Sequence, residues 1–163
     1  MATPELKTCI FIGRSGCGKG TQAKRLIEKL ASLPGQVPAV YIETGRVFRE
    51  FITGLSYTQQ LARQVTEVGG RQPDFLAIWN WAEILIKETT GQEHIIFDGA
   101  PRSPLEAQVV DTAMRYYKRQ EPTIVYLNVS KNWAFDRLKG RGRQDDDDAK
   151  INNRLAWFDR DVL

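Results

Sequence analysis

The sequence predicts an α/β fold with a central parallel sheet and helices on both of its faces. Short apolar runs occur at residues 6–12, 39–42, 94–97 and 123–129, and segments with helical spacing lie between them. These runs do not alternate between apolar and polar residues, a pattern typical of strands that are covered on both faces. The first run leads directly into a glycine-rich loop and then into a helix, as expected of a phosphate-binding unit.

Composition restricts the class of protein. The chain has 163 residues, of which 42% are hydrophobic and 26% charged, values typical of one globular domain with a core. The net charge of +3 is too small to indicate nucleic acid as a partner. The longest mostly apolar stretch, 75–86, contains Asn80 and Glu83 and is shorter than the roughly 20 residues of a membrane span. We expect neither a nucleic-acid nor a membrane partner.

Cysteine and histidine usage points in the same direction. Cys9 and Cys17 form no disulfide or zinc pattern, and unpaired thiols are typical of the cytosol. His94 is the single histidine, which leaves little room for histidine-based metal or triad chemistry. Residues 1–8 lack the features of a signal peptide. The sequence therefore predicts a cytoplasmic protein.

Helix positions follow from spacing and capping residues. Residues 23–30 have apolar side chains at helical spacing, and Pro34-Gly35 ends this segment. About fifty residues separate the second and third strands, more than a crossover needs. Ser56 and Gln59 form a capping-box pattern there, and Asp74 is expected to cap an apolar helix that follows. We interpret 44–73 as a small helical insertion into a core of 1–43 and 74–163.

The glycine-rich loop carries the clearest chemical signal. Residues 13–21 read Gly-Arg-Ser-Gly-Cys-Gly-Lys-Gly-Thr between a strand and a helix, which is a P-loop pattern. Glycines let backbone N–H groups turn toward a phosphate, and the helix N-terminus adds partial positive charge. The strict pattern has Ser or Thr after the lysine, whereas Gly20 stands here. A three-layer P-loop fold is expected, with a nucleoside triphosphate bound by Gly16, Cys17, Gly18, Lys19, Gly20 and Thr21.

The order Gly-Lys-Gly-Thr-Gln resembles the adenylate kinase and nucleoside monophosphate kinase family, and the resemblance extends from Ile10 to about Asp159. Later segments are similar to family motifs in the same order: ETGRVFR at 43–49, GGRQPD at 69–74 and FDGAPR at 97–102. A last segment resembles the pattern R-x-D-D…R through Arg143, Asp145, Asp146 and Arg154.

The resemblance implies Mg²⁺-dependent transfer of the ATP γ-phosphoryl group to a nucleoside monophosphate, with AMP as the first-choice acceptor. Such a reaction depends on positioning and charge neutralisation, for which arginines suit phosphate. The residues implied at the transferring group are Lys19, Arg102, Arg141, Arg143 and Arg154. Those implied at the acceptor are Thr44, Arg49, Gly70, Arg71, Gln72, Gly99 and Arg102. Arg137 is implied to stack on the donor base, and Asp98 to hold Mg²⁺ through water.

Some features depart from the family pattern. Glu106 stands where the adenylate kinase pattern has Gln, and the resemblance implies that it contacts the acceptor base. A carboxylate can only accept hydrogen bonds, which favours guanine over adenine as that base. Alternatively, Glu106 completes a capping box with Ser103. The lid, about 140–144, is almost absent. The strand and helix that end the family fold are expected to be missing after Leu163.

Alternative functions follow from these departures. With so short a lid, the chain could be a nucleotide-binding regulatory module that is catalytically weak. It could also be a P-loop kinase of another small metabolite, although the segments at 44–45 and 98–102 argue against that. The expected partners are ATP and a nucleoside monophosphate, and a monomer is the family default. Trp79, Trp81 and Trp157 are interpreted as core or domain-contact residues.

Overall fold

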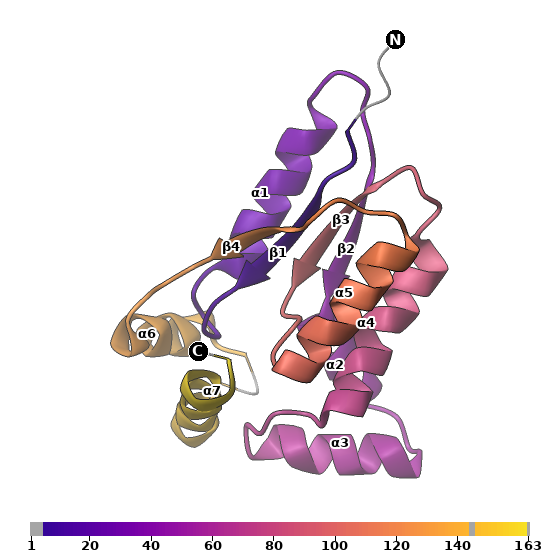
Figure 1. Ribbon diagram of the computed structural model, residues 1–163. Helices are drawn as coiled ribbons and strands as arrows, with labels where there is room; N and C mark the ends of the chain where they lie inside the picture. Colours follow the sequence, from indigo (N-terminus) through magenta and orange to yellow (C-terminus); the bar gives the residue numbers. More distant parts are fainter. Residues whose placement is uncertain (1–4, 144–145, 163) are drawn as a thin grey trace.

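A four-stranded parallel sheet forms the centre of the molecule, in the order β2-β3-β1-β4 (Figure 1). The computed structural model describes residues 5–143 and 146–162. The strands are β1 (Thr8–Ile12), β2 (Ala39–Glu43), β3 (His94–Asp98) and β4 (Thr123–Tyr126). The helices are α1 (Lys19–Ala31), α2 (Thr44–Phe51), α3 (Tyr57–Glu67), α4 (Asp74–Glu88), α5 (Pro104–Tyr116), α6 (Lys131–Arg141) and α7 (Asp148–Asp161). The predicted α/β fold with a parallel sheet is confirmed.

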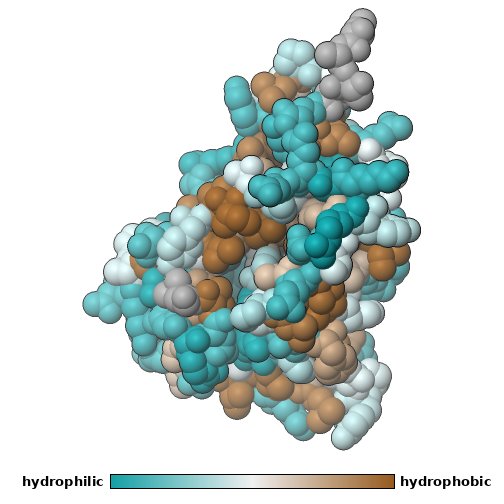
Figure 2. All heavy atoms as spheres, in the orientation of Figure 1, coloured by the Kyte–Doolittle hydropathy of each residue, from teal (hydrophilic) through white to brown (hydrophobic). Residues whose placement is uncertain are grey.

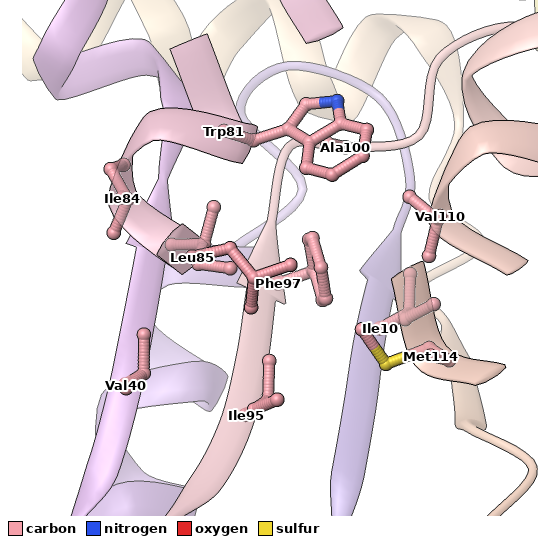
Figure 3. Packing of buried hydrophobic residues seen from close by; sticks show 11 residues of the cluster. Ile10, Val40, Trp81, Ile84, Leu85, Ile95, Phe97, Ala100, Val110 and Met114 are labelled. Carbon is pink, nitrogen blue, oxygen red and sulfur yellow. The ribbon is translucent and has the colours of Figure 1, made fainter. Parts of the chain in front are cut away.

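One face of the sheet packs against α4 and α5 (Figure 3). Trp81 of α4 is 1% exposed, and its ring lies 5.9 Å from that of Phe97 in β3, nearly edge-on. The same cluster holds Ile10, Val40, Ile95, Leu85, Val110 and Met114. Side chains alternate between the faces of a strand, so Cys9, Phe11 and Ile96 point to the opposite face and pack against α1. The inner strands are thus covered on both faces, as the sequence predicts.

β4 is an exception, because it lies at an edge of the sheet. The sequence predicts a covered strand over 123–129, but the observed strand ends at Tyr126 and is largely exposed. Ile124 is 54% exposed, and Figure 2 shows apolar surface over this part of the molecule. The prediction of cover on both faces is wrong for β4, since the helices pack mainly over β1, β2 and β3.

The caps explain where the helices begin. Ser56 and Gln59 form the predicted capping box, with Ser56 N donating to Gln59 Oε1 at 2.9 Å. Asp74 does not cap α4: Pro73 takes that position, and the Asp74 carboxylate accepts from Arg71 and from Ser103 instead. Ser103 caps α5 by accepting from Glu106 N at 3.1 Å. Only this half of the box is present among the described residues, and the buried Glu106 Oε1 has no hydrogen-bond partner there.

The carboxyl ends of the strands lie at one end of the sheet. All strand pairs are parallel, and the register aligns Glu43 of β2 with Asp98 of β3, and Asp98 with Phe11 of β1. The carboxyl ends of these strands therefore meet, where ligands bind in open α/β sheets. Within the described residues, no helix is long and apolar enough to cross a membrane.

Helix α6 supports the P-loop from outside the sheet. Gly16 has a φ of +84°, and a Cβ at this position would lie 2.7 Å from Ala134 O and 2.8 Å from a carbon of Leu138. Ala134 and Leu138 of α6 are fully buried against Ile151 and Leu155 of α7. The α6–α7 pair is therefore a second small core that packs directly against the loop.

We expect Leu138→Ala to lower the free energy of unfolding by about 2–5 kcal/mol, because it leaves a cavity in this small core. Leu138 is 0% exposed. Urea unfolding checks the value, and Leu105→Ala, at a side chain that is 50% exposed, is the matched control, with an expected change of about 0.5 kcal/mol or less. Equal losses in the two variants would contradict the packing argument.

Candidate active site

The P-loop joins β1 to the N-terminus of α1. Gly18 is the N-cap of α1 with a φ of +97°, and no side chain caps this helix within the described residues. The first N–H groups of α1 are thus left for another acceptor. Lys19 Nζ donates to Gly13 O at 2.6 Å and to Arg14 O at 2.9 Å, so the lysine lies folded along the loop. Burial lowers the pKa of Lys19, while the Cys17 thiol and the Asp98 carboxylate act in the opposite direction.

A cavity of about 850 Å³ lies over the carboxyl ends of the strands. Its walls come from the P-loop, α2, the segment between α3 and α4, α6 and α7. The predicted site residues that line it are Gly16, Gly18, Lys19, Gly20, Thr21, Arg49, Gly70, Gln72, Asp98, Gly99, Arg102, Arg137, Arg141, Arg143 and Arg154. Those that do not are Cys17, Thr44, Arg71 and Glu106. One cavity therefore gathers cationic side chains from elements far apart in the sequence.

Asp98 is the carboxylate beside the P-loop. It ends β3, and its Oδ2 accepts a hydrogen bond from the Tyr41 hydroxyl at 2.9 Å. Burial, together with the Asp98 charge, raises the pKa of Tyr41 well above its usual range, so this hydroxyl stays a donor. Mg²⁺ prefers oxygen ligands, and in nucleotide sites it is held by one or two carboxylates, water and phosphates. Asp98, which lines the cavity with Thr21, fits a magnesium ion held through water.

Arg102, which lines the cavity, is linked to Thr44, which does not. Arg102 Nη2 donates to Thr44 Oγ1 at 3.2 Å, and Thr44 Oγ1 donates to Gly99 O at 3.0 Å. Burial lowers the pKa of Arg102, while the charges of Glu106 and Asp98 raise it. Thr44 therefore acts on Arg102 from behind the cavity wall. Arg49 Nη2 lies 3.4 Å from Glu43 Oε1.

Asp146 holds two of the predicted arginines. Its carboxylate accepts from Arg141 Nε and Nη2, both at 2.9 Å, and from Arg154 Nη2 at 2.6 Å. Burial acts to raise the pKa of Asp146, but the hydrogen bonds from both guanidinium groups outweigh it and lower the pKa. Asp147, the next residue, caps α7. Gln144 and Asp145, which belong to the same motif, lie outside the described residues.

Helices α6 and α7 also place aromatic rings at the cavity. The Arg137 guanidinium lies 5.2 Å from the Trp133 ring, and both residues line the cavity. The Arg102 guanidinium lies 5.8 Å from the Trp157 ring. The sequence prediction left Tyr41, Trp133 and Trp157 out of the site. The signal for Trp157 was its spacing, since it follows Arg154 by three residues and so lies on the same side of α7.

Arg71 and Glu106 belong to a charged cluster behind the cavity. Arg71 Nη1 lies 2.7 Å from Asp74 Oδ1 and 3.9 Å from Glu106 Oε1, and its Nε lies 3.4 Å from Asp161 Oδ2. Glu106 is 1% exposed. Burial raises the pKa of Glu106, while the charge of Arg102 acts to lower it. The Arg71 side chain thus connects α4, α5 and α7.

The chain is similar to known proteins along most of its length. A family model described as adenylate kinase matches residues 11–162. The chain is 32% identical to the adenylate kinase of Mycobacterium sp. (strain MCS), over 91% of this chain and 78% of that protein. It is 33% identical to the adenylate kinase of Mycobacterium ulcerans (strain Agy99) over the same shares. The adenylate kinase of Leuconostoc mesenteroides is 31% identical, over 92% of this chain and 76% of that protein.

Glu106→Gln should change the stability of the fold by an amount that depends on pH. Because the folded pKa of Glu106 is raised, the wild type loses stability as pH rises from the ordinary glutamate pKa, about 4.3, through the folded pKa. Glutamine does not titrate, so the free energy of unfolding of the variant relative to the wild type should increase across this window and then stay constant. Urea unfolding between about pH 4 and 8 tests it, with the exposed Glu88→Gln as control. A difference independent of pH would contradict the argument.

Proposed function

The chain belongs to the adenylate kinase family, and from this premise we propose that it transfers the γ-phosphoryl group of ATP to AMP, which gives two molecules of ADP. One observation carries the proposal: Lys19, Arg102, Arg141 and Arg154 line one cavity although they come from separate elements. Their combined charge matches two phosphate chains that meet in line. The two alternatives, a regulatory module and a kinase of another metabolite, are not favoured by the family membership.

The P-loop end of the cavity is proposed to bind ATP. The N-terminal N–H groups of α1 would donate hydrogen bonds to oxygens of the β- and γ-phosphates, and Lys19 would leave Gly13 O and Arg14 O to bridge these phosphates. Arg137, paired with Trp133 at the cavity wall, would stack on the adenine. Asp98 would hold Mg²⁺ through water, and this ion, when bound, would offset phosphate charge.

The segment 44–73 is proposed as the acceptor-binding unit. Arg49 and Arg102 would hold the α-phosphate of AMP, with Thr44 orienting Arg102. Gly70 and Gln72 line the cavity near α3, where the base and sugar would lie. An oxygen of that α-phosphate would attack the γ-phosphorus while its bond to the bridging oxygen of ADP breaks. The acceptor is already an anion, so no protein group needs to remove a proton.

Asp146 is proposed to prepare the transfer step. It holds Arg141 and Arg154 at the cavity before any phosphate arrives, which supports a preorganised pair of donors for the developing charge. Arg143 lines the same wall. The connection between α6 and α7, which contains the shortened lid, is short, because α6 extends to Arg141 and α7 begins at Asp148. A monomeric state and a cytoplasmic location stay predictions.

A coupled assay for ADP with ATP and AMP tests the proposal. Lys19→Ala should lower kcat about 100-fold or more, because the Lys19 charge acts on charge that develops in the transition state. Lys29→Ala is the matched control, an exposed lysine in the last turn of α1 whose loss should leave kcat unchanged. If Lys19→Ala retained activity within a few-fold of the wild type, the donor site would be wrongly assigned.

The variant Glu106→Gln tests which base the acceptor site prefers. We propose that the Glu106 carboxylate reaches the cavity when the acceptor binds and accepts N–H groups of the base. A carboxylate repels the N1 lone pair of adenine but fits the N1–H and N2–H donors of guanine. The variant should therefore raise the ratio of kcat/KM for AMP to that for GMP, by up to about a hundredfold. An unchanged ratio would assign Glu106 to holding Arg71 and α5 instead.

A further inference from the structure

Trp157 touches two separate parts of the proposed acceptor site. Its ring lies 5.8 Å from the Arg102 guanidinium, and its Nε1 donates to Gly69 O at 3.2 Å. Trp157 is 8% exposed, and it also lines the cavity. An indole face attracts a guanidinium that lies over it, and the N–H groups at the edge of the guanidinium do not take part in this contact. A guanidinium that lies over the indole face keeps its N–H donors available to other acceptors.

The segment that Trp157 holds is attached to α7 at neighbouring residues. Asn153 Nδ2 donates to Val68 O at 2.7 Å, and Val68 directly precedes Gly69, which accepts from Trp157. Gly69 has a φ of +67°, and a Cβ there would lie 2.5 Å from Lys150 O, so the segment packs directly on the α7 backbone. In Figure 1, α7 lies beside the end of α3 from which this segment leads to α4. Helix α7 thus fixes one wall of the acceptor site.

Arg102 depends on few protein contacts for its orientation. Among the described residues, its guanidinium donates to Thr44 Oγ1 through Nη2. Asp98 and Glu106 influence Arg102 by charge, and charge alone does not set the plane of a guanidinium. A planar group with five N–H donors binds phosphate well only when its edge faces the oxygens. Besides Thr44 Oγ1, the Trp157 ring is the group that contacts this guanidinium among the described residues.

We propose that Trp157 is a positioning residue that orients Arg102 toward the acceptor phosphate and holds the Gly69 segment at the same time. This inference rests on the proposed function. It assigns to α7 a role at the acceptor end of the cavity, besides the role of Arg154 at the transferring group. Loss of Trp157 should therefore weaken binding of the acceptor and leave binding of ATP unchanged.

Substitutions separate the two contacts. Trp157→Phe keeps a ring over Arg102 and removes the bond to Gly69 O, whereas Trp157→Leu removes both contacts. Asn153→Ala is the matched control, because it removes a bond to the same segment without touching Arg102. We expect the KM for AMP to rise about twofold to threefold in Trp157→Phe and in Asn153→Ala, and about tenfold in Trp157→Leu. The KM for ATP should stay within about twofold in each.

A merely structural role predicts a different pattern: fewer folded molecules, a lower apparent kcat and unchanged KM values. Equal KM values for AMP in Trp157→Leu and Trp157→Phe, or an equal rise for ATP and AMP, would overturn the proposal. If Trp157→Leu does not fold, tryptophan fluorescence replaces it: AMP alone should change the emission of the wild type and not of Trp157→Phe. An unchanged wild-type emission would equally overturn the proposal. Absence of ADP formation by the wild type would instead reject the proposed function.

Discussion

Lys19, Arg102, Arg141 and Arg154 bring positive charges into one cavity, and the rest of the structure depends on balancing them. Cations that repel one another and lose water on burial are costly unless carboxylates face them. Each has such a neighbour: Asp98 acts on Lys19 and Arg102, Asp146 bonds Arg141 and Arg154, and Glu106 acts on Arg102. Asp98 lines the cavity together with these cations, whereas Asp146 and Glu106 do not line it.

Helix α7 contacts several parts of the molecule that border the cavity. Its apolar side, Ile151 and Leu155, packs on α6, which in turn supports the P-loop. Another part of α7 carries Arg154 and Trp157 into the cavity and bonds the segment between α3 and α4. A change in α7 packing would therefore act on both the P-loop and the segment between α3 and α4. Helix α7 therefore forms part of the cavity wall, next to the short connection that joins it to α6.

Glu106 shows how a single substitution relative to a family pattern changes meaning in three dimensions. As a sequence feature it suggested either base recognition or a capping box. In the structure the carboxylate lies buried, with Oε1 3.9 Å from Arg71; Ser103 caps α5, and Glu106 Oε1 accepts no hydrogen bond within the described residues. A buried carboxylate with a raised pKa lowers stability near neutral pH, so its position is costly in a way that glutamine would avoid.

The sequence by itself determined the P-loop, the helix starts at Ser56 and Ser103, the parallel sheet and most cationic residues of the cavity. These are local patterns, set by neighbours within one element or by motif spacing. The tertiary structure alone decided that Asp74 bonds Ser103, that β4 is exposed, and that the Trp157 ring lies against the Arg102 guanidinium. Each of these depends on which elements pack together, because side chains remote in sequence choose their partners by proximity and burial.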